Sequence, residues 1–222
     1  MSSISLKLGY KYLRSNKGGT FSFTTLLAII GLSIGISSLI VVTSVMNGFE
    51  KELEDRILGV IPHSVISSDE PIDDYEDLIN QVKKDANILE ASTYIDTQGI
   101  ISSSYDTRGV SLIGIDPLKE KNMSIIPDYM LVGDLNDLNE DNTIIIGSLL
   151  AAQIGAYIGD EVNITTSDIR TTLIGSYPRS VNLEVVGIFE LKTEIDQYLT
   201  LISHSTSQKI KNLKANQTTG IR

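Results

Sequence analysis

The chain has 222 residues, and its 28 Asp and Glu against 18 Lys and Arg give a formal net charge of −10. This acidity argues against binding nucleic acid through the bulk of the chain. The absence of cysteine excludes a disulfide framework and any thiolate metal site. With only two histidines and no tryptophan, the residues available for catalysis are few.

The first long element expected is a membrane-spanning helix. Residues 18–49 form a run of 32 residues without Asp, Glu, Lys or Arg, and about 20 such residues cross a bilayer core. As a helix the run would extend on the order of 48 Å against about 30 Å of hydrocarbon, so part of it should leave the lipid. A cleavable signal peptide is disfavoured, because the run is about twice as long as a signal h-region and no small-x-small site follows it.

The charges that flank this run predict its orientation. Four basic residues and no acidic one precede it: Lys7, Lys11, Arg14 and Lys17. After it, 14 basic residues face all 28 acidic ones. The positive-inside rule therefore places the N-terminus in the cytoplasm and the chain from about residue 50 onward on the other side of the membrane. Residues 1–17 are expected to form a short interfacial amphipathic helix, although their apolar residues also alternate as in a strand.

One face of the predicted membrane helix consists of small residues at spacings of three and four, which lets another helix approach closely. Generic intramembrane packing and a specific subunit contact both fit this face. Its packing residues are Ala28, Gly31, Gly35 and Ser38, preceded by Thr24.

The helix is expected to continue beyond the lipid into water. Four apolar residues keep the helical spacing: Phe49, Leu53, Ile57 and Val60. Glu52 and Arg56 form an i,i+4 pair, and Pro62 is expected to end the helix. Residues 18–60 are thus predicted as one rod that leads from the membrane into a soluble domain.

The soluble domain is predicted to mix helices and strands in two parts. The first part, residues 61–130, reads as β-α-β-β: a strand at 62–68, a helix at 73–85 with Asp73 as its N-cap, and paired strands at 91–104 and 109–116 around a turn at 106–108. The second part, residues 131–204, is a β-rich insert: a strand at 142–148, a helix at 149–156, and strands at 159–166, 181–190 and 197–203. Residues 205–222 return to the first lobe, with a helix at 205–213.

Residues 167–180 stand between two strands of the insert and are judged too long for a tight hairpin. Segments of this length inside compact domains are usually functional or disordered. The apolar residues Leu173, Ile174 and Tyr177, together with two arginines, favour a protruding recognition hairpin over a mobile tip.

Six motifs follow one another along nearly the whole chain: GYKYLRS, VVTSVMNGFEKEL, ILGVIPHSVISS, GIDP, IIIGSLLAAQIGAYIGDEV and GSYPRSVNLEVVGIF. Together they resemble the LolC/LolE family of lipoprotein-releasing permeases, within the wider MacB/FtsX superfamily. The spacing before the first proline-containing hairpin favours the LolC side, with LolE and fused forms close to it. The resemblance implies an α+β fold, a MacB-like periplasmic core domain in which a mixed α/β lobe carries the β-rich insert.

The resemblance also implies a function in the bacterial inner membrane, with the N-terminus in the cytoplasm and the chain from about residue 50 onward in the periplasm. With a cytoplasmic ABC ATPase (LolD-like) and a second permease subunit (LolE-like or a second copy), such a permease extracts acylated lipoproteins and passes them to a periplasmic carrier (LolA-like). No cofactor is expected in this chain, since ATP and magnesium would be bound by the ATPase. The chain would then be an N-terminal fragment lacking three membrane helices, with an unpaired sheet edge at 220–222.

Two sets of site residues follow from the resemblance. A hook that captures the carrier maps onto residues 167–180, with Leu173, Ile174, Tyr177, Pro178 and Arg179. The outer end of the first helix, which helps to line the cavity for acyl chains, maps onto Val42, Val45 and Met46. A flexible Met suits a greasy ligand of variable shape, although plain helix packing explains Met46 equally well.

Other functions are weighed against this one. The chain has no G-x-x-x-x-G-K-[ST] or G-x-G-x-x-G motif, and no catalytic or metal-binding residue is predicted. His63 and His204 are interpreted as solvated polar residues. The alternatives are a MacB-type efflux permease, an FtsX-type regulator of cell-wall hydrolases, and a non-transporting, membrane-anchored carrier-binding module.

Overall fold

The computed structural model describes residues 4, 7, 9, 11, 23–139, 141–172 and 175–222. They fall into two compact units, Met1–Glu52 and Leu53–Arg222. Of the predicted interfacial helix at 1–17, only four residues are described, and all four are helical: Ile4, Lys7, Gly9 and Lys11. The rest of that segment lies outside the described residues.

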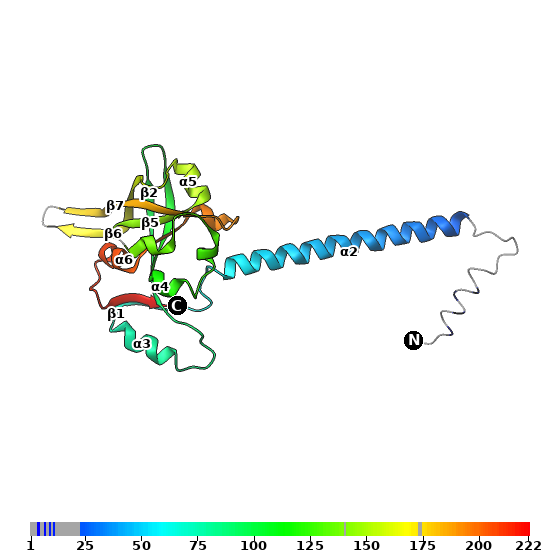
Figure 1. Cartoon of the computed structure of the whole chain (residues 1–222), viewed down its shortest axis with the longest axis horizontal. Coiled ribbons are helices and arrows are strands. Elements are labelled where there is room, and N and C mark those ends of the chain that lie inside the picture. Colours follow the sequence, from blue (N-terminus) through cyan, green and yellow to red (C-terminus); the bar gives the residue numbers. More distant parts are fainter. Residues whose placement is uncertain are drawn as a thin grey trace. The chain divides into compact units, whose positions relative to one another are not determined.

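Helix α2 runs continuously over the 36 residues Phe23–Leu58 (Figure 1). In the described part of the chain it is the one helix long and apolar enough to cross a membrane, as the sequence predicts. It ends at Leu58, earlier than expected from Pro62. The amides of Val60 and Ile61 both donate to the Ile57 carbonyl, at 3.1 and 3.0 Å, so the chain turns directly after the helix.

The second unit is built on six strands that close into a barrel. In order around the ring they are β2 (Thr93–Ser102), β3 (Thr107–Ile115), β8 (Leu199–Ser203), β5 (Thr143–Gly147), β7 (Gly175–Phe189) and β6 (Glu161–Thr172), which pairs back onto β2. The pairs β3–β8 and β5–β7 are parallel, and the others are antiparallel. Closure gives each of these strands a neighbour on both sides.

Side chains from all six strands fill the barrel interior, which is the largest hydrophobic cluster of the described residues. Two helices, α5 (Ser148–Ile154) and α6 (His204–Lys211), add side chains to the same cluster. Gly114 on β3 lets α6 approach, because a Cβ there would lie 2.1 Å from Ser207 Oγ. The strand residues of the cluster are Ile101, Val110, Leu112, Ile144, Ile146, Val162, Ile164, Leu183, Val185 and Ile202.

A second cluster covers the outer face of β3, β5 and β8. It is formed with short elements that the sequence did not predict: η1 (Ile126–Tyr129), β4 (Met130–Val132), η2 (Leu135–Asn139) and η3 (Glu194–Gln197). The short helix α4 (Pro117–Glu120), directly after β3, was not predicted either. Ile57 and Val60, at and just after the end of α2, pack into this cluster with Leu191 and Ile195.

A third layer consists of β1 (Ile66–Asp73), α3 (Tyr75–Val82) and β9 (Gln217–Ile221). Strand β9 lies between β1 and β2, with Ile221 opposite both Ile66 and Thr93. The predicted unpaired edge at 220–222 is therefore wrong. Arg222 is also held by a buried ion pair with Glu120 and by two backbone bonds to Ser92, each 3.0 Å long.

Two local predictions in this layer need correction. The strand expected at 62–68 begins only at Ile66 and continues to Asp73, since Ile72 and Asp73 pair with β9 again after a register shift. Asp73 therefore belongs to β1 and does not cap α3. The N-cap is Asp74, in the left-handed region at φ 51° and without a side-chain cap bond.

The remaining predicted elements are present in the predicted order, β-α-β-β followed by the elements of the insert. The largest changes of boundary are in β6 and β7, each of which extends six residues into the segment expected to connect them. Strands from both predicted lobes share the barrel: β2 and β3 come from residues 61–130, and β5 to β8 from 131–204. The lobe boundaries themselves stay a prediction.

Candidate functional site

The hairpin of β6 and β7 has two differently supported halves. From Asn163 to Thr166, β6 pairs with β7 on one side and with β2 on the other. From Ile169 to Thr172, its described pairings are with β7 alone. We call the distal half, residues 169–172 and 175–178, the ribbon; Figure 1 shows it projecting beyond the other strands.

A bulge marks the root of the ribbon. Thr166 pairs with Arg179 and Ile169 with Pro178, so β6 contains two extra residues at this point. Proline cannot donate to a strand ladder and is found in sheets at edges and bulges, which suits Pro178 to this place. The segment was judged too long for a tight hairpin, and this is wrong, because pairing continues to Thr172 opposite Gly175.

The predicted hook residues are distributed along this hairpin. Leu173 and Ile174 lie outside the described residues, as does the side chain of Tyr177. Pro178 is exposed. Arg179 is partly buried and bonds within the domain: Nη1 donates to the Ile210 carbonyl at 2.7 Å and Nη2 to Asn212 Oδ1 at 3.4 Å.

Arg179 thereby ties the root of the ribbon to the C-terminal end of α6. A cation at this end of a helix satisfies carbonyls that lack an intrahelical partner and complements the helix dipole. The predicted contact of these five residues with a carrier stays a prediction.

The predicted residues of the first helix all lie on its exposed surface. Val42, Val45 and Met46 are 63%, 67% and 64% exposed. The small residues Ala28, Gly31, Gly35 and Ser38 are also exposed, and a Cβ added at either glycine would meet nothing within 4 Å. A shallow hollow along the helix includes one residue from each set, Ser38 and Val42. Neither the packing role nor the acyl-chain role is tested by these positions.

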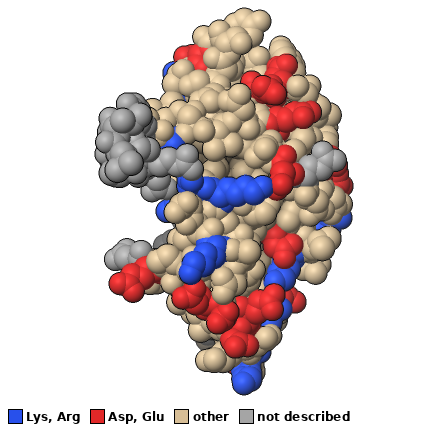
Figure 2. Space-filling view, turned by 90° about the vertical axis from the view of Figure 1, so that its left-hand side faces the viewer, with Lys and Arg blue, Asp and Glu red and all other residues tan. Residues whose placement is uncertain are grey.

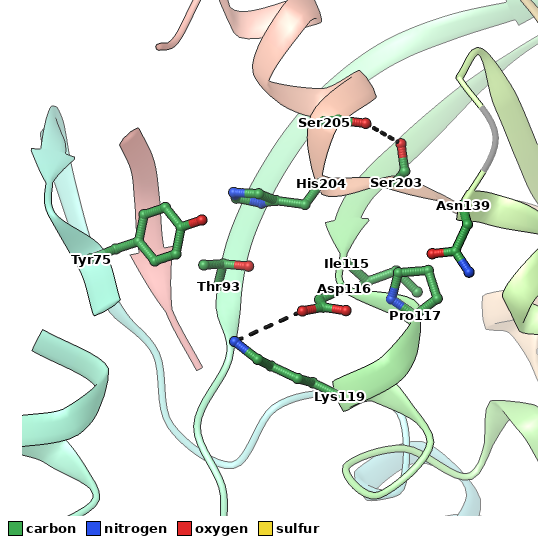
Figure 3. A pocket seen from close by; sticks show the side chains of 10 residues that line it. All are labelled: Tyr75, Thr93, Ile115, Asp116, Pro117, Lys119, Asn139, Ser203, His204 and Ser205. Carbon is green, nitrogen blue, oxygen red and sulfur yellow. Dashed lines mark hydrogen bonds and ion pairs between the residues drawn. The ribbon is translucent and has the colours of Figure 1, made fainter. Parts of the chain in front are cut away.

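A polar cavity of about 170 Å³ lies where α3, α4 and the start of α6 meet the end of β3 (Figure 3). Asp116 caps α4, accepting from the Leu118 amide at 3.1 Å, and lies 3.8 Å from Lys119 Nζ. The His204 ring stands edge-on to Tyr75, with ring centroids 5.5 Å apart. The volume is below the roughly 300–1,000 Å³ of typical small-molecule sites, so we do not treat the cavity as a ligand site.

His204 corrects a prediction, because it is partly buried, with both ring nitrogens shielded from solvent, rather than solvated. Within the described protein, neither of its ring nitrogens has a hydrogen-bond partner. Burial lowers the pKa of His204 from its ordinary 6.5 to about 4; Asp116 acts against this shift and Lys119 with it. His63, in contrast, is exposed as predicted.

The face seen from the ribbon side is mixed in charge. Figure 2 shows Asp and Glu along its right and lower parts, interleaved with Lys and Arg. Neither sign forms one continuous field over the described residues of this face.

An apolar helix that continues into an α+β barrel domain defines a class of membrane-anchored domains. The sequence model for the MacB-like periplasmic core domain matches residues 25–219, and the chain belongs to that family. This confirms the predicted fold class and the resemblance inferred from the motifs.

The curated relatives refine the family. The chain is 33% identical over its whole length to the lipoprotein-releasing system transmembrane protein LolC of Neisseria meningitidis, covering 54% of that protein. It is 30% identical to LolC of Xylella fastidiosa, over 99% of this chain and 53% of the relative. LolE of Haemophilus influenzae is 24% identical over 96% of this chain and 53% of the relative. The chain thus spans about half the length of the curated relatives it matches.

Among solved structures, the periplasmic region of MacB from Actinobacillus actinomycetemcomitans is similar with a TM-score of 0.47. The sequence identity is 14%, and the match covers 77% of this chain and 78% of the other.

Proposed function

We propose that the chain is the N-terminal part of a permease subunit in an ABC transporter that releases lipoproteins from the inner membrane and passes them to a periplasmic carrier. The observation that carries this proposal is the identity with LolC proteins along the entire chain, including α2, the barrel and the hairpin. The complete motif set from GYKYLRS to GSYPRSVNLEVVGIF supports it.

The proposed topology follows from the charges around α2. The basic residues before it belong in the cytoplasm, and the acidic domain after it belongs in the periplasm. In this arrangement the barrel and its ribbon face the compartment in which a soluble lipoprotein carrier would be met.

Each proposed partner has a separate role in transport. A cytoplasmic ATPase binds ATP and magnesium, and this chain binds no cofactor. A second permease subunit packs on the small-residue face of α2 from Ala28 to Ser38, where close helix approach is sterically possible. Lipoprotein acyl chains contact Val42, Val45 and Met46, whose exposed apolar side chains suit a hydrocarbon ligand.

The ribbon is the proposed site of carrier capture. It leaves the barrel at a bulge, it projects from the domain, and its root is fixed by Arg179 to α6. An extended hairpin of this kind offers backbone and side chains to a partner without disturbing the core of its own domain.

Site-specific photocrosslinking in the full-length protein tests this proposal. A photoreactive residue at Tyr177 should crosslink to the soluble periplasmic carrier, and the same residue at Tyr157 should not. Tyr157 is a matched control because it is also a tyrosine and is 72% exposed, on the segment after α5. Efflux and cell-wall regulation predict no carrier adduct at either position, so the absence of an adduct at residue 177 would overturn the proposal.

A further inference from the structure

One arginine attaches the last turn of α2 to the barrel domain. Arg56 Nη1 donates to the Leu191 carbonyl at 2.8 Å, across 135 positions of sequence. The same guanidinium group lies over the ring of Tyr129, 5.4 Å from its centroid. A planar guanidinium can stack on a ring and donate in its own plane at once, which a lysine ammonium cannot.

Tyr129 and Leu191 are neighbours at one end of the sheet. Tyr129 directly precedes β4, and Leu191 follows the end of β7 by two residues. The strands pair there, with Met130 opposite Phe189, and the Glu190 amide donates to the Tyr129 carbonyl at 2.9 Å. Arg56 therefore contacts the ends of two paired strands at the same time.

Leu191 is itself firmly placed. Its side chain is fully buried, and its amide donates to both carboxylate oxygens of Asp196 at 3.0 and 3.1 Å. The Lys192 amide donates to the same buried carboxylate at 2.8 Å. The Leu191 carbonyl, which accepts from Arg56, therefore belongs to a segment whose backbone conformation is fixed by these hydrogen bonds.

Strand β7 connects this attachment point to the ribbon as one strand, with a register shift against β5 between Val185 and Gly187. It runs for 15 residues, from Gly175 in the ribbon to Phe189 beside the Arg56 contact. At about 3.3 Å per residue it spans roughly 50 Å. Along this length it is paired to β6 and then to β5 and β4, which makes it stiff in the plane of the sheet.

We propose that Arg56 is a positioning residue that joins the end of α2 to β7, so that a displacement of the helix end reaches the ribbon along one strand. The inference rests on the proposed function in one respect, namely that the ribbon is where the carrier is captured. The mechanical link itself follows from the contacts of Arg56 with Tyr129 and Leu191 and from the pairing of β7, and it does not require the carrier.

The link can be tested in the full-length permease with its ATPase partner in lipid nanodiscs. This chain has no cysteine, so labels at Ser176→Cys in the ribbon and Tyr105→Cys in the exposed β2–β3 turn report one distance, once any cysteine elsewhere in the protein is replaced by serine. The distance is measured by pulsed electron paramagnetic resonance with and without a non-hydrolysable ATP analogue. We expect the wild-type distance distribution to shift with nucleotide.

The variants separate coupling from simple stability. Arg56→Ala should lose at least half of the nucleotide-dependent shift, while carrier affinity without nucleotide stays within about twofold. Arg56→Lys should recover part of the shift, because it keeps a donor for the Leu191 carbonyl. Tyr129→Leu keeps apolar bulk in the core and should give an intermediate loss. Arg108→Ala is the charge-matched control, since Arg108 pairs with Asp106 near the protein surface, and it should shift as the wild type does.

The outcomes distinguish this inference from the proposed function. A full shift in Arg56→Ala, or no shift in the wild type, overturns the inference even where Tyr177 crosslinks to the carrier. Failure of that crosslink removes the proposed function, whereas loss of the shift in Arg56→Ala and its partial recovery in Arg56→Lys would still support the mechanical link.

Discussion

The barrel and the ribbon share the strands β6 and β7, yet the two regions are held together by different contacts. In the barrel, β6 has β7 on one side and β2 on the other, and its inward residues Val162 and Ile164 are each 1% exposed. In the ribbon, the described pairings of the same strand are with β7 alone. The bulge between Thr166 and Ile169 separates these two regimes within three residues of one strand.

This difference indicates how stability and recognition are divided. A closed barrel satisfies its backbone and buries its apolar side chains whatever the ribbon does, whereas an isolated two-stranded hairpin is at best marginally stable in water. The barrel can therefore present a ribbon whose residues are free to serve a partner. Each of the following experiments tests whether a substitution affects the stability of the barrel or the contribution of the ribbon.

The largest effect is expected in the barrel core. Leu150 on α5 is fully buried, so Leu150→Ala should lower the free energy of unfolding by about 2–5 kcal/mol, through lost transfer energy and a residual cavity. Chemical denaturation of the detergent-solubilised chain measures this. The neighbouring Leu149 is 43% exposed, and Leu149→Ala should cost no more than about 0.5 kcal/mol. Equal losses in the two variants would contradict the assignment of the core.

A smaller effect is expected where the barrel meets the α3 layer, at His204. Because its pKa falls from 6.5 to about 4 on folding, the unfolded state binds more protons between these values. Stability should therefore be unaffected above pH 6.5 and should fall by roughly 1–3 kcal/mol as the pH drops towards 4, after allowance for partial solvent screening.

The charged and titratable groups that face His204 are Tyr75, Asp116 and Lys119. His204→Phe and His204→Gln remove the titrating ring and leave these three groups in place. Both variants should show a shallower loss of unfolding free energy between pH 6.5 and 4. An unchanged slope in both variants would mean that other groups cause the acid sensitivity.

Segments with a strong apolar pattern could be predicted from the sequence. The run from Thr143 to Gly147 is buried at every position and forms β5, and the long apolar run forms α2. The elements between residues 117 and 139 were missed, because helices and strands of three to five residues carry no measurable periodicity. Strand β9 was missed because Thr218 and Gly220 are buried by their pairing with β1 and β2 and give no hydrophobic signal.

The parts of the candidate site that depend on contacts between residues far apart in the sequence could not be predicted either. Arg56 could be placed beside Glu52 from helical spacing, but its partner Leu191 is 135 residues away. His204 is shielded by α3, whose Tyr75 packs beside it from a position more than 100 residues earlier in the sequence. The proline and glycine in GSYPRS are typical of a loop, and the bulge that accommodates Pro178 within a strand depends on its pairing with β6.

A more modest effect is expected at the root of the ribbon. Arg179→Ala removes a charge-assisted bond of 2.7 Å to the Ile210 carbonyl and should cost about 1 kcal/mol of unfolding free energy, since the side chain is only partly buried. Thermal and chemical denaturation measure the change. Arg108→Ala, which breaks an ion pair with Asp106 near the surface, should cost less than about 0.5 kcal/mol. A smaller loss for Arg179→Ala than for Arg108→Ala would mean that the bond to α6 does not hold the ribbon.

The smallest effect on stability is expected from removing the ribbon altogether. Thr166 and Arg179 are paired, so replacing residues 167–178 by Asn-Gly closes β6 and β7 with a two-residue turn. The unfolding free energy should change by no more than about 0.5 kcal/mol, because the pairings lost within the ribbon are offset by the entropy of ordering it. Capture of the carrier, measured by pull-down with the full-length protein, should be abolished. A loss above about 2 kcal/mol would show that the ribbon is part of the folding unit, because point changes away from the core rarely cost so much.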